Sequence, residues 1–105
     1  MKEGFDSPRD RQMLYSVYLI INFNARNSIS YVGYTNNLKK RITKHNSSKG
    51  AKFTRGRKWK LAYSKRYLSK SIAMREEYKL KKNIKLRNKI KLKFKKNENF
   101  NITPL

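Results

Sequence analysis

The chain has 105 residues, no cysteine, and 28 Lys and Arg residues against 6 Asp and Glu, which gives a formal net charge of +22. This length fits one small domain, and the missing thiols exclude disulfides, a disulfide-linked partner and cysteine-based zinc fingers. The charge favours a polyanionic partner, nucleic acid first, and the alternative is a general bias toward Lys and Asn at exposed positions.

Both ends of the chain are polar. We expect residues 1–13 and 96–105 to be flexible tails around an ordered body at residues 14–95. The first tail has no apolar segment typical of a secretory signal, and the longest apolar-rich run, LYSVYLII, is too short to span a bilayer. We therefore expect a cytoplasmic protein with no membrane partner.

The segments LYSVYLIIN and ISYVGYT are rich in aromatic and β-branched residues, and the turn-rich connection between them predicts a β-hairpin. Alternation places Tyr18 and Ile20 on one face of the first strand, and Tyr31 and Gly33 on one face of the second. A glycine beside a tyrosine opens room above the sheet. Tyr34 falls on the opposite face from Tyr31, where we expect it to pack.

The next segment, TNNLKKRITKHN, predicts a helix with Thr35 or Asn36 as its N-cap. Arg41 and His45 are four residues apart, so they lie together on one stripe of this helix.

The segment SSKGAKFTRGRKWK mixes cations, small residues and two aromatic residues, Phe53 and Trp59. We interpret it as a mobile loop. It is either a solvated connector or, as we favour, a loop that contacts the nucleic-acid backbone and stacks on bases. Its candidate nucleic-acid-binding residues are Lys49, Lys52, Arg55, Arg57 and Lys58. The following LAYSKRYL predicts a third strand.

The segment SKSIAMREEYKLKK predicts a second helix, capped by Ser69 or Ser71. Its apolar arc would consist of Ile72, Ala73, Met74, Tyr78 and Leu80. Glu76 and Glu77, the only acids in the expected body, interrupt this arc. Burying an unpaired carboxylate is costly, so at least one of them should face a cation, a metal or a wet cleft. The spacing does not choose between the two.

The last basic segment, NIKLRNKIKLKFKK, fits both an alternating strand and an i, i+4 helical stripe, and we interpret it as a third helix. The resulting order is strand, strand, helix, strand, helix, helix. It predicts an α+β domain with a three-stranded antiparallel sheet flanked by helices.

Several of these residues together resemble the signature of the GIY-YIG nuclease superfamily. The resemblance rests on SVY at 16–18, YVG at 31–33, and then Arg41, His45 and Glu77 in that order. The segments KGAKFTRGR and LAYSKRYLSKSIAMREEYKLKK are similar to its small stand-alone bacterial branch, called YhbQ-like. An asparagine that many members carry after the glutamate has two candidate matches here, Asn83 and Asn88.

The resemblance implies a set of site residues. Tyr18 and Tyr31 would face the active site, and Gly33 would be structural there. Arg41 would stabilise phosphate charge, because its planar fork matches phosphate oxygens. Glu77 would hold Mg²⁺, or Mn²⁺, with water completing the coordination.

The remaining expectations concern the reaction. One tyrosine would deprotonate the attacking water, and we expect the cationic site to lower its pKa. His45 would assist as a base or as a hydrogen-bond donor to phosphate. We expect a metal-dependent DNA endonuclease acting on branched or single-strand-containing DNA, because nothing resembles a sequence-reading module. The alternative is a non-catalytic nucleic-acid-binding protein of ribosomal or nucleoid type on the same fold.

Overall fold

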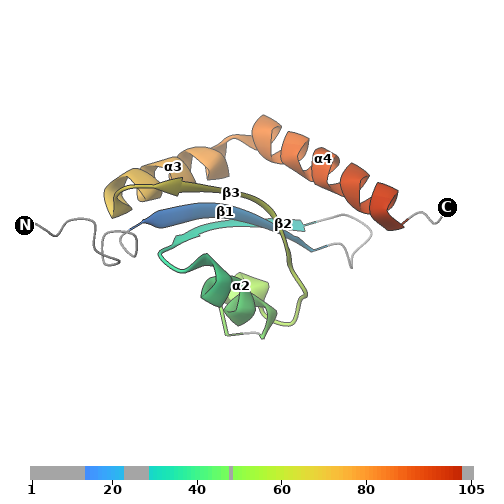
Figure 1. Ribbon diagram of the computed structural model, residues 1–105, viewed down its shortest axis with the longest axis horizontal. Helices are drawn as coiled ribbons and strands as arrows, with labels where there is room; N and C mark the ends of the chain where they lie inside the picture. Colours follow the sequence, from blue (N-terminus) through green and yellow to red (C-terminus); the bar gives the residue numbers. More distant parts are fainter. Residues whose placement is uncertain (1–13, 23–28, 48, 103–105) are drawn as a thin grey trace, which may run out of the picture.

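The computed structural model describes residues 14–22, 29–47 and 49–102. Its strands β1 (Tyr15–Asn22), β2 (Ile29–Thr35) and β3 (Lys60–Tyr67) form one antiparallel sheet in the order β2-β1-β3. The helical segments are α2 (Leu38–Asn46), the short 3₁₀ helix η1 (Lys52–Thr54), α3 (Lys70–Lys82) and α4 (Ile84–Ile102). Figure 1 shows α2 on one face of the sheet and α3 and α4 on the other. The predicted α+β architecture is confirmed.

The C-terminal helix is longer than we expected. α4 continues through Ile102, although we expected a flexible tail from residue 96. Residues 97–102 include neither Gly nor Pro, and the first residue that strongly opposes a helix is Pro104. The expected N-terminal tail at residues 1–13 lies outside the described residues, as do residues 103–105. Within the described part of the chain, no helix has the length and apolar character needed to cross a bilayer.

β1 is the central strand, and its side chains are buried on both faces of the sheet. Tyr18 and Ile20 pack with Trp59 on the α2 side, which confirms the predicted alternation. Leu38 and Ile42 of α2 pack against the same cluster. The core on the α3 side consists of Val17, Leu19, Ile21, Val32, Ala73 and Leu80.

The helices begin at side-chain caps. Ser69 caps α3, as predicted, by accepting a hydrogen bond from the N–H of Ile72 at 3.2 Å. α2 is capped by Asn37, so the expected cap at Thr35 or Asn36 is wrong. The Thr35 hydroxyl instead accepts the N–H of Asn37 at 3.1 Å, and this turn delays the start of the helix.

The apolar arc predicted for α3 is only partly correct. Ala73 and Leu80 are buried, but Met74 is 46% exposed and Tyr78 is 59% exposed. The stripe that faces the sheet therefore runs from Ala73 to Leu80, and the half-buried Glu76 and Glu77 lie between them. The helix is thus rotated so that both acids approach the sheet.

Candidate active site

A pocket of about 470 Å³ opens at the edge of β2, and we call it the active-site pocket. Its lining includes Tyr18 from β1, Tyr31 and Gly33 from β2, Arg41 from α2 and Glu77 from α3. Figure 1 shows α2, which carries the arginine, and α3, which carries the glutamate, on opposite faces of the sheet. The structure therefore brings together residues that are far apart in the sequence.

Gly33 is the direct cross-strand partner of Tyr18. A Cβ atom at position 33 would lie 2.6 Å from the Tyr18 Oη and 3.2 Å from Cε2 of Tyr31. The space that we expected beside this glycine exists, and the Tyr18 ring occupies it. Gly33 thus allows Tyr18 to reach over β2.

The Tyr18 hydroxyl takes part in a chain of buried hydrogen bonds. Its Oη lies 2.7 Å from His45 Nε2, and Arg41 Nε–H donates to it at 3.4 Å. Behind the histidine, the Thr54 hydroxyl donates to the Ala51 carbonyl at 2.8 Å and lies 2.9 Å from His45 Nδ1. A hydroxyl has one proton to donate, so Thr54 accepts from Nδ1–H. Nε2 is then unprotonated and accepts the Tyr18 O–H.

His45 lies behind Tyr18 and does not line the active-site pocket. It is fully buried, and both of its ring nitrogens have partners. In this arrangement neither ring nitrogen of His45 is free to contact a phosphate. Burial, with a smaller effect of the Arg41 charge, lowers the pKa of His45 to about 4. The ring is neutral at pH 7 and positions Tyr18.

The pKa of Tyr18 is raised, and not lowered as we expected. Burial of the phenol has the largest effect and outweighs the hydrogen bond and the charge of Arg41, which act in the opposite direction. The pKa of Arg41 is also raised, mainly because Tyr18 accepts its hydrogen bond. At neutral pH the pair is an uncharged phenol and a guanidinium cation.

Tyr31 is half-buried, so it is the more accessible of the two tyrosines. Its ring meets the His45 ring edge-on, with centroids 5.1 Å apart. It also stacks on Phe53 at 6.1 Å with an angle of 20° between the ring planes. Tyr34 packs against the core on the α3 side, as predicted, although it also lines the active-site pocket.

The loop between α2 and β3 is anchored by specific contacts, which sequence reasoning missed. The Asn46 amide bonds both backbone groups of Trp59, accepting from its N–H at 2.6 Å and donating to its carbonyl at 3.1 Å. Trp59 is 4% exposed and donates its indole N–H to the Thr54 carbonyl. A Cβ at Gly50 would lie 2.5 Å from His45 Nδ1, so this glycine packs on the histidine. Trp59 is a core residue and not the base-stacking residue that we expected.

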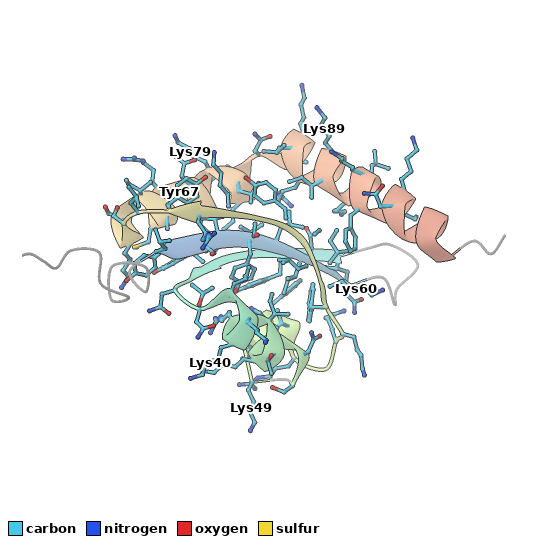
Figure 2. The ribbon with its side chains drawn as sticks, viewed as in Figure 1. Lys40, Lys49, Lys60, Tyr67, Lys79 and Lys89 are labelled. Atoms are coloured by element: carbon cyan, nitrogen blue, oxygen red, sulfur yellow. The ribbon has the colours of Figure 1, made fainter. Side chains whose placement is uncertain are left out.

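The predicted nucleic-acid-binding residues of this loop do not line the active-site pocket. Four of them are exposed, and the fifth, Arg57, is half-buried with its guanidinium 5.7 Å from the Phe53 ring centre. Lys40 and Lys49 project away from the sheet on the α2 side, and Lys79 and Lys89 project from the α3 and α4 side (Figure 2). Exposed lysines therefore lie on both sides of the sheet, on the side of α2 and on the side of α3 and α4.

The two acids of α3 have different surroundings. Glu77 lines the active-site pocket with a side chain 16% exposed, and its carboxylate lies 3.4 Å from the Lys81 ammonium. Glu76 is 29% exposed, pairs with Lys79 at 3.4 Å, and does not line that pocket. Lys70, the first residue of α3, also lines the pocket. No sequence signal separated it from the other cations of the chain.

The pocket offers few metal ligands. The described residues contain no group of three or more His, Asp or Glu side chains that would enclose an ion. Glu77 supplies a single carboxylate beside the tyrosines. This donor set fits Mg²⁺ or Mn²⁺, because Mg²⁺ keeps several of its waters, and it does not fit a tetrahedral zinc site. Asn83, a candidate for the family's asparagine, instead caps the first turn of α4 through the N–H of Leu86.

Comparisons with known proteins give the family. Residues 14–97 match the family model described as the GIY-YIG catalytic domain. A UPF0213 protein of Oceanobacillus iheyensis is 46% identical over 66 residues, which cover 62% of this chain and 73% of that protein. One from Bacillus licheniformis is 47% identical over 60 residues (56% and 62%), and one from Halobacterium salinarum is 39% identical over 69 residues (65% and 86%). No solved structure matches.

These findings agree with the expected YhbQ-like branch and imply nuclease-type activity. Nucleases of this family act on DNA and are generally dependent on divalent metals. The match begins at the start of β1, extends into α4, and includes every residue of the pocket named above. The chain belongs to the GIY-YIG catalytic domain family.

Proposed function

We propose that this protein is a metal-dependent endonuclease that hydrolyses phosphodiester bonds in branched or single-strand-containing DNA. The observation that carries the proposal is the meeting of Tyr18, Tyr31, Arg41 and Glu77 in one pocket. A phosphodiester resists hydrolysis because its negative charge repels the nucleophile and because the leaving alkoxide is poor. The pocket contains the residue types that oppose both effects.

Arg41 is suited to bind the phosphate that is cut. Its Nε–H is held by the Tyr18 oxygen, and Tyr31 also hydrogen-bonds the guanidinium, so the remaining N–H donors are left for phosphate oxygens. Tyr18 is itself fixed by His45, and His45 by Thr54. The buried chain of hydrogen bonds therefore orients the arginine, and a fixed donor stabilises developing charge better than a mobile one.

Tyr31 is suited to contact the attacking water. It is half-buried and lines the active-site pocket, whereas Tyr18 has no exposed surface and its hydroxyl is already bonded to two partners. In this role the Tyr31 hydroxyl orients the water, and its phenolate form, once the phenol proton has left to solvent, takes the proton of the water. Tyr18 then acts mainly by positioning Arg41.

Glu77 would hold the divalent ion, with water as the remaining ligands. When bound there, Mg²⁺ polarises the phosphoryl oxygen or stabilises the leaving oxygen. Lys81 now neutralises the Glu77 carboxylate and would give up that contact. Glu76 has its own lysine partner and lies outside the pocket, so it serves as a matched control.

The test is nicking of branched, flapped and linear DNAs with and without Mg²⁺. We expect cleavage only with the metal, a loss of about 10²–10³-fold for Arg41→Ala, and a comparable loss for Glu77→Gln. Glu76→Gln should cut like the unmodified protein. If the protein binds DNA tightly but leaves every substrate uncut with every divalent ion, the enzyme proposal fails and the non-catalytic alternative is favoured.

A further inference from the structure

A second pocket, of about 300 Å³, lies beside the active-site pocket, and we call it the flanking pocket. The two pockets share Tyr31. Its lining residues are Ser30, Tyr31, Val32, Phe53, Lys81 and Arg87. This lining contains two aromatic rings and two cations but no acid. Aromatic rings beside cations are the combination that proteins use to hold unpaired nucleotides.

Phe53 gives the flanking pocket an accessible aromatic surface. It is 50% exposed, whereas Trp59, the other aromatic residue of the same loop, is 4% exposed. The Phe53 ring is supported by Tyr31 at 6.1 Å and by Trp59 at 6.3 Å, and the Arg57 guanidinium lies over it at 5.7 Å. Neighbours on several sides restrict the ring, so it is a fixed platform on which a base can stack at low entropic cost.

Arg87 gives the flanking pocket an unsatisfied donor. Among the described residues, its Nε is the buried side-chain nitrogen that has no hydrogen-bond partner. Leaving a buried donor without a hydrogen bond costs free energy, and the planar guanidinium matches the oxygens of a phosphate well. Lys81 lines the same pocket and contacts Glu77 of the active-site pocket at 3.4 Å. Lys81 therefore links the positive charge of the flanking pocket to the carboxylate of the active-site pocket.

We propose that the flanking pocket binds one unpaired nucleotide next to the phosphate that is cut, with its base on Phe53 and its phosphate on Arg87 and Lys81. The inference rests on the proposed function for the identity of the neighbouring site, and it narrows the substrate class. A paired base is stacked on its neighbours within the duplex and presents no face to Phe53. The favoured substrate is DNA with an unpaired nucleotide at the cleavage point.

Binding without divalent metal tests this inference separately from catalysis. Fluorescence anisotropy would compare a duplex with the same duplex that carries one unpaired 2-aminopurine. We expect Phe53→Ala to weaken binding of the second DNA by about 5- to 150-fold, as loss of one stacked base does, and to leave the perfect duplex unchanged. Phe53→Tyr keeps the ring and should keep the affinity. The 2-aminopurine emission should fall on binding to the unmodified protein but not to Phe53→Ala.

The chain offers matched controls for both parts of the flanking pocket. Tyr78 is 59% exposed with the Lys82 ammonium 5.2 Å from its ring centre, so Tyr78→Ala removes a similar aromatic residue from outside this pocket. Lys89→Gln removes one charge from α4, as Arg87→Gln does, but Lys89 projects away from the body (Figure 2). We expect Arg87→Gln to weaken binding more than Lys89→Gln.

Equal effects of Phe53→Ala and Tyr78→Ala, or equal losses on paired and unpaired DNA, would overturn the inference. If the protein cuts no substrate but still lowers the 2-aminopurine emission in a way that depends on Phe53, the result would count against the proposed nuclease and support the binding site.

Discussion

Gly33 gives the most direct test of the site geometry, because its replacement by alanine must displace Tyr18. The added Cβ would lie 2.6 Å from Tyr18 Oη and 2.8 Å from Cζ, whereas ordinary contact begins at 3.4 Å. The hydroxyl would have to move by about 0.8 Å, the difference between the 2.6 Å distance to Oη and the 3.4 Å of ordinary contact. Tyr18 has no solvent-exposed surface, so this movement also displaces the side chains that pack around its ring.

The expected cost has two parts. Overpacking of a filled core costs about 1–3 kcal/mol. Movement of the hydroxyl also stretches its 2.7 Å bond to His45, and an unsatisfied buried group costs about 1–3 kcal/mol more. We therefore expect Gly33→Ala to lower the free energy of unfolding by about 2–6 kcal/mol, a large share of the stability of a small domain.

Urea unfolding at pH 7, followed by the fluorescence of Trp59, the only tryptophan of the chain, measures this cost. Tyr18→Phe removes the atom that clashes most, so the double variant should be more stable than the two single effects predict, by about 1 kcal/mol. Gly56→Ala is the control. Gly56 has a φ of 75°, and a Cβ added there would have no neighbour within 4 Å. The loss of stability in Gly56→Ala would therefore come from backbone strain and should add to the loss caused by Tyr18→Phe.

Additive effects of Gly33→Ala and Tyr18→Phe, within about 0.3 kcal/mol, would refute the geometry. The Tyr18 ring would then not lie over Gly33, and the orientation of Arg41 would need another explanation.

Three further predictions concern residues of α2 and of the loop that follows it. The pKa of His45 is lowered to about 4, so its contribution to stability is complete above pH 6.5 and is lost as the pH falls toward 4. Unfolding at pH 7 and pH 4.5 should therefore show a loss, of up to about 3 kcal/mol, that is absent in His45→Gln. Asn46→Ala should cost about 1–3 kcal/mol, because it leaves both backbone groups of Trp59 without this partner. Thr43→Ala removes an exposed hydroxyl and should cost little, and equal losses would contradict the anchoring role. Thr54→Val removes the acceptor for His45 Nδ1–H, so ¹⁵N NMR should detect the Nδ1–H tautomer in the unmodified protein and a mixture in the variant.

Periodicity and local signals in the sequence determined the secondary structure and the broad architecture. The hairpin, the third strand and the three helices lie where their patterns predicted them. Alternation correctly separated Tyr18 from Val17, and Ile90 and Phe94 of α4 pack against the core on one i, i+4 stripe. These features follow from neighbours close in the chain. The candidate site set came from the family resemblance, and the structure gathers most of it in one pocket.

Tertiary structure alone decided how the site is built. The rotation of α3 is set by the packing of Ala73 and Leu80, and this rotation places Glu77 in the pocket and Glu76 outside it. His45 became a buried positioning residue, and Tyr18 a phenol with a raised pKa, because burial depends on every element packed around a side chain. The sequence by itself determined which side chains are available, but contacts across the fold decided which of them reach solvent, and those contacts join residues that no local pattern connects.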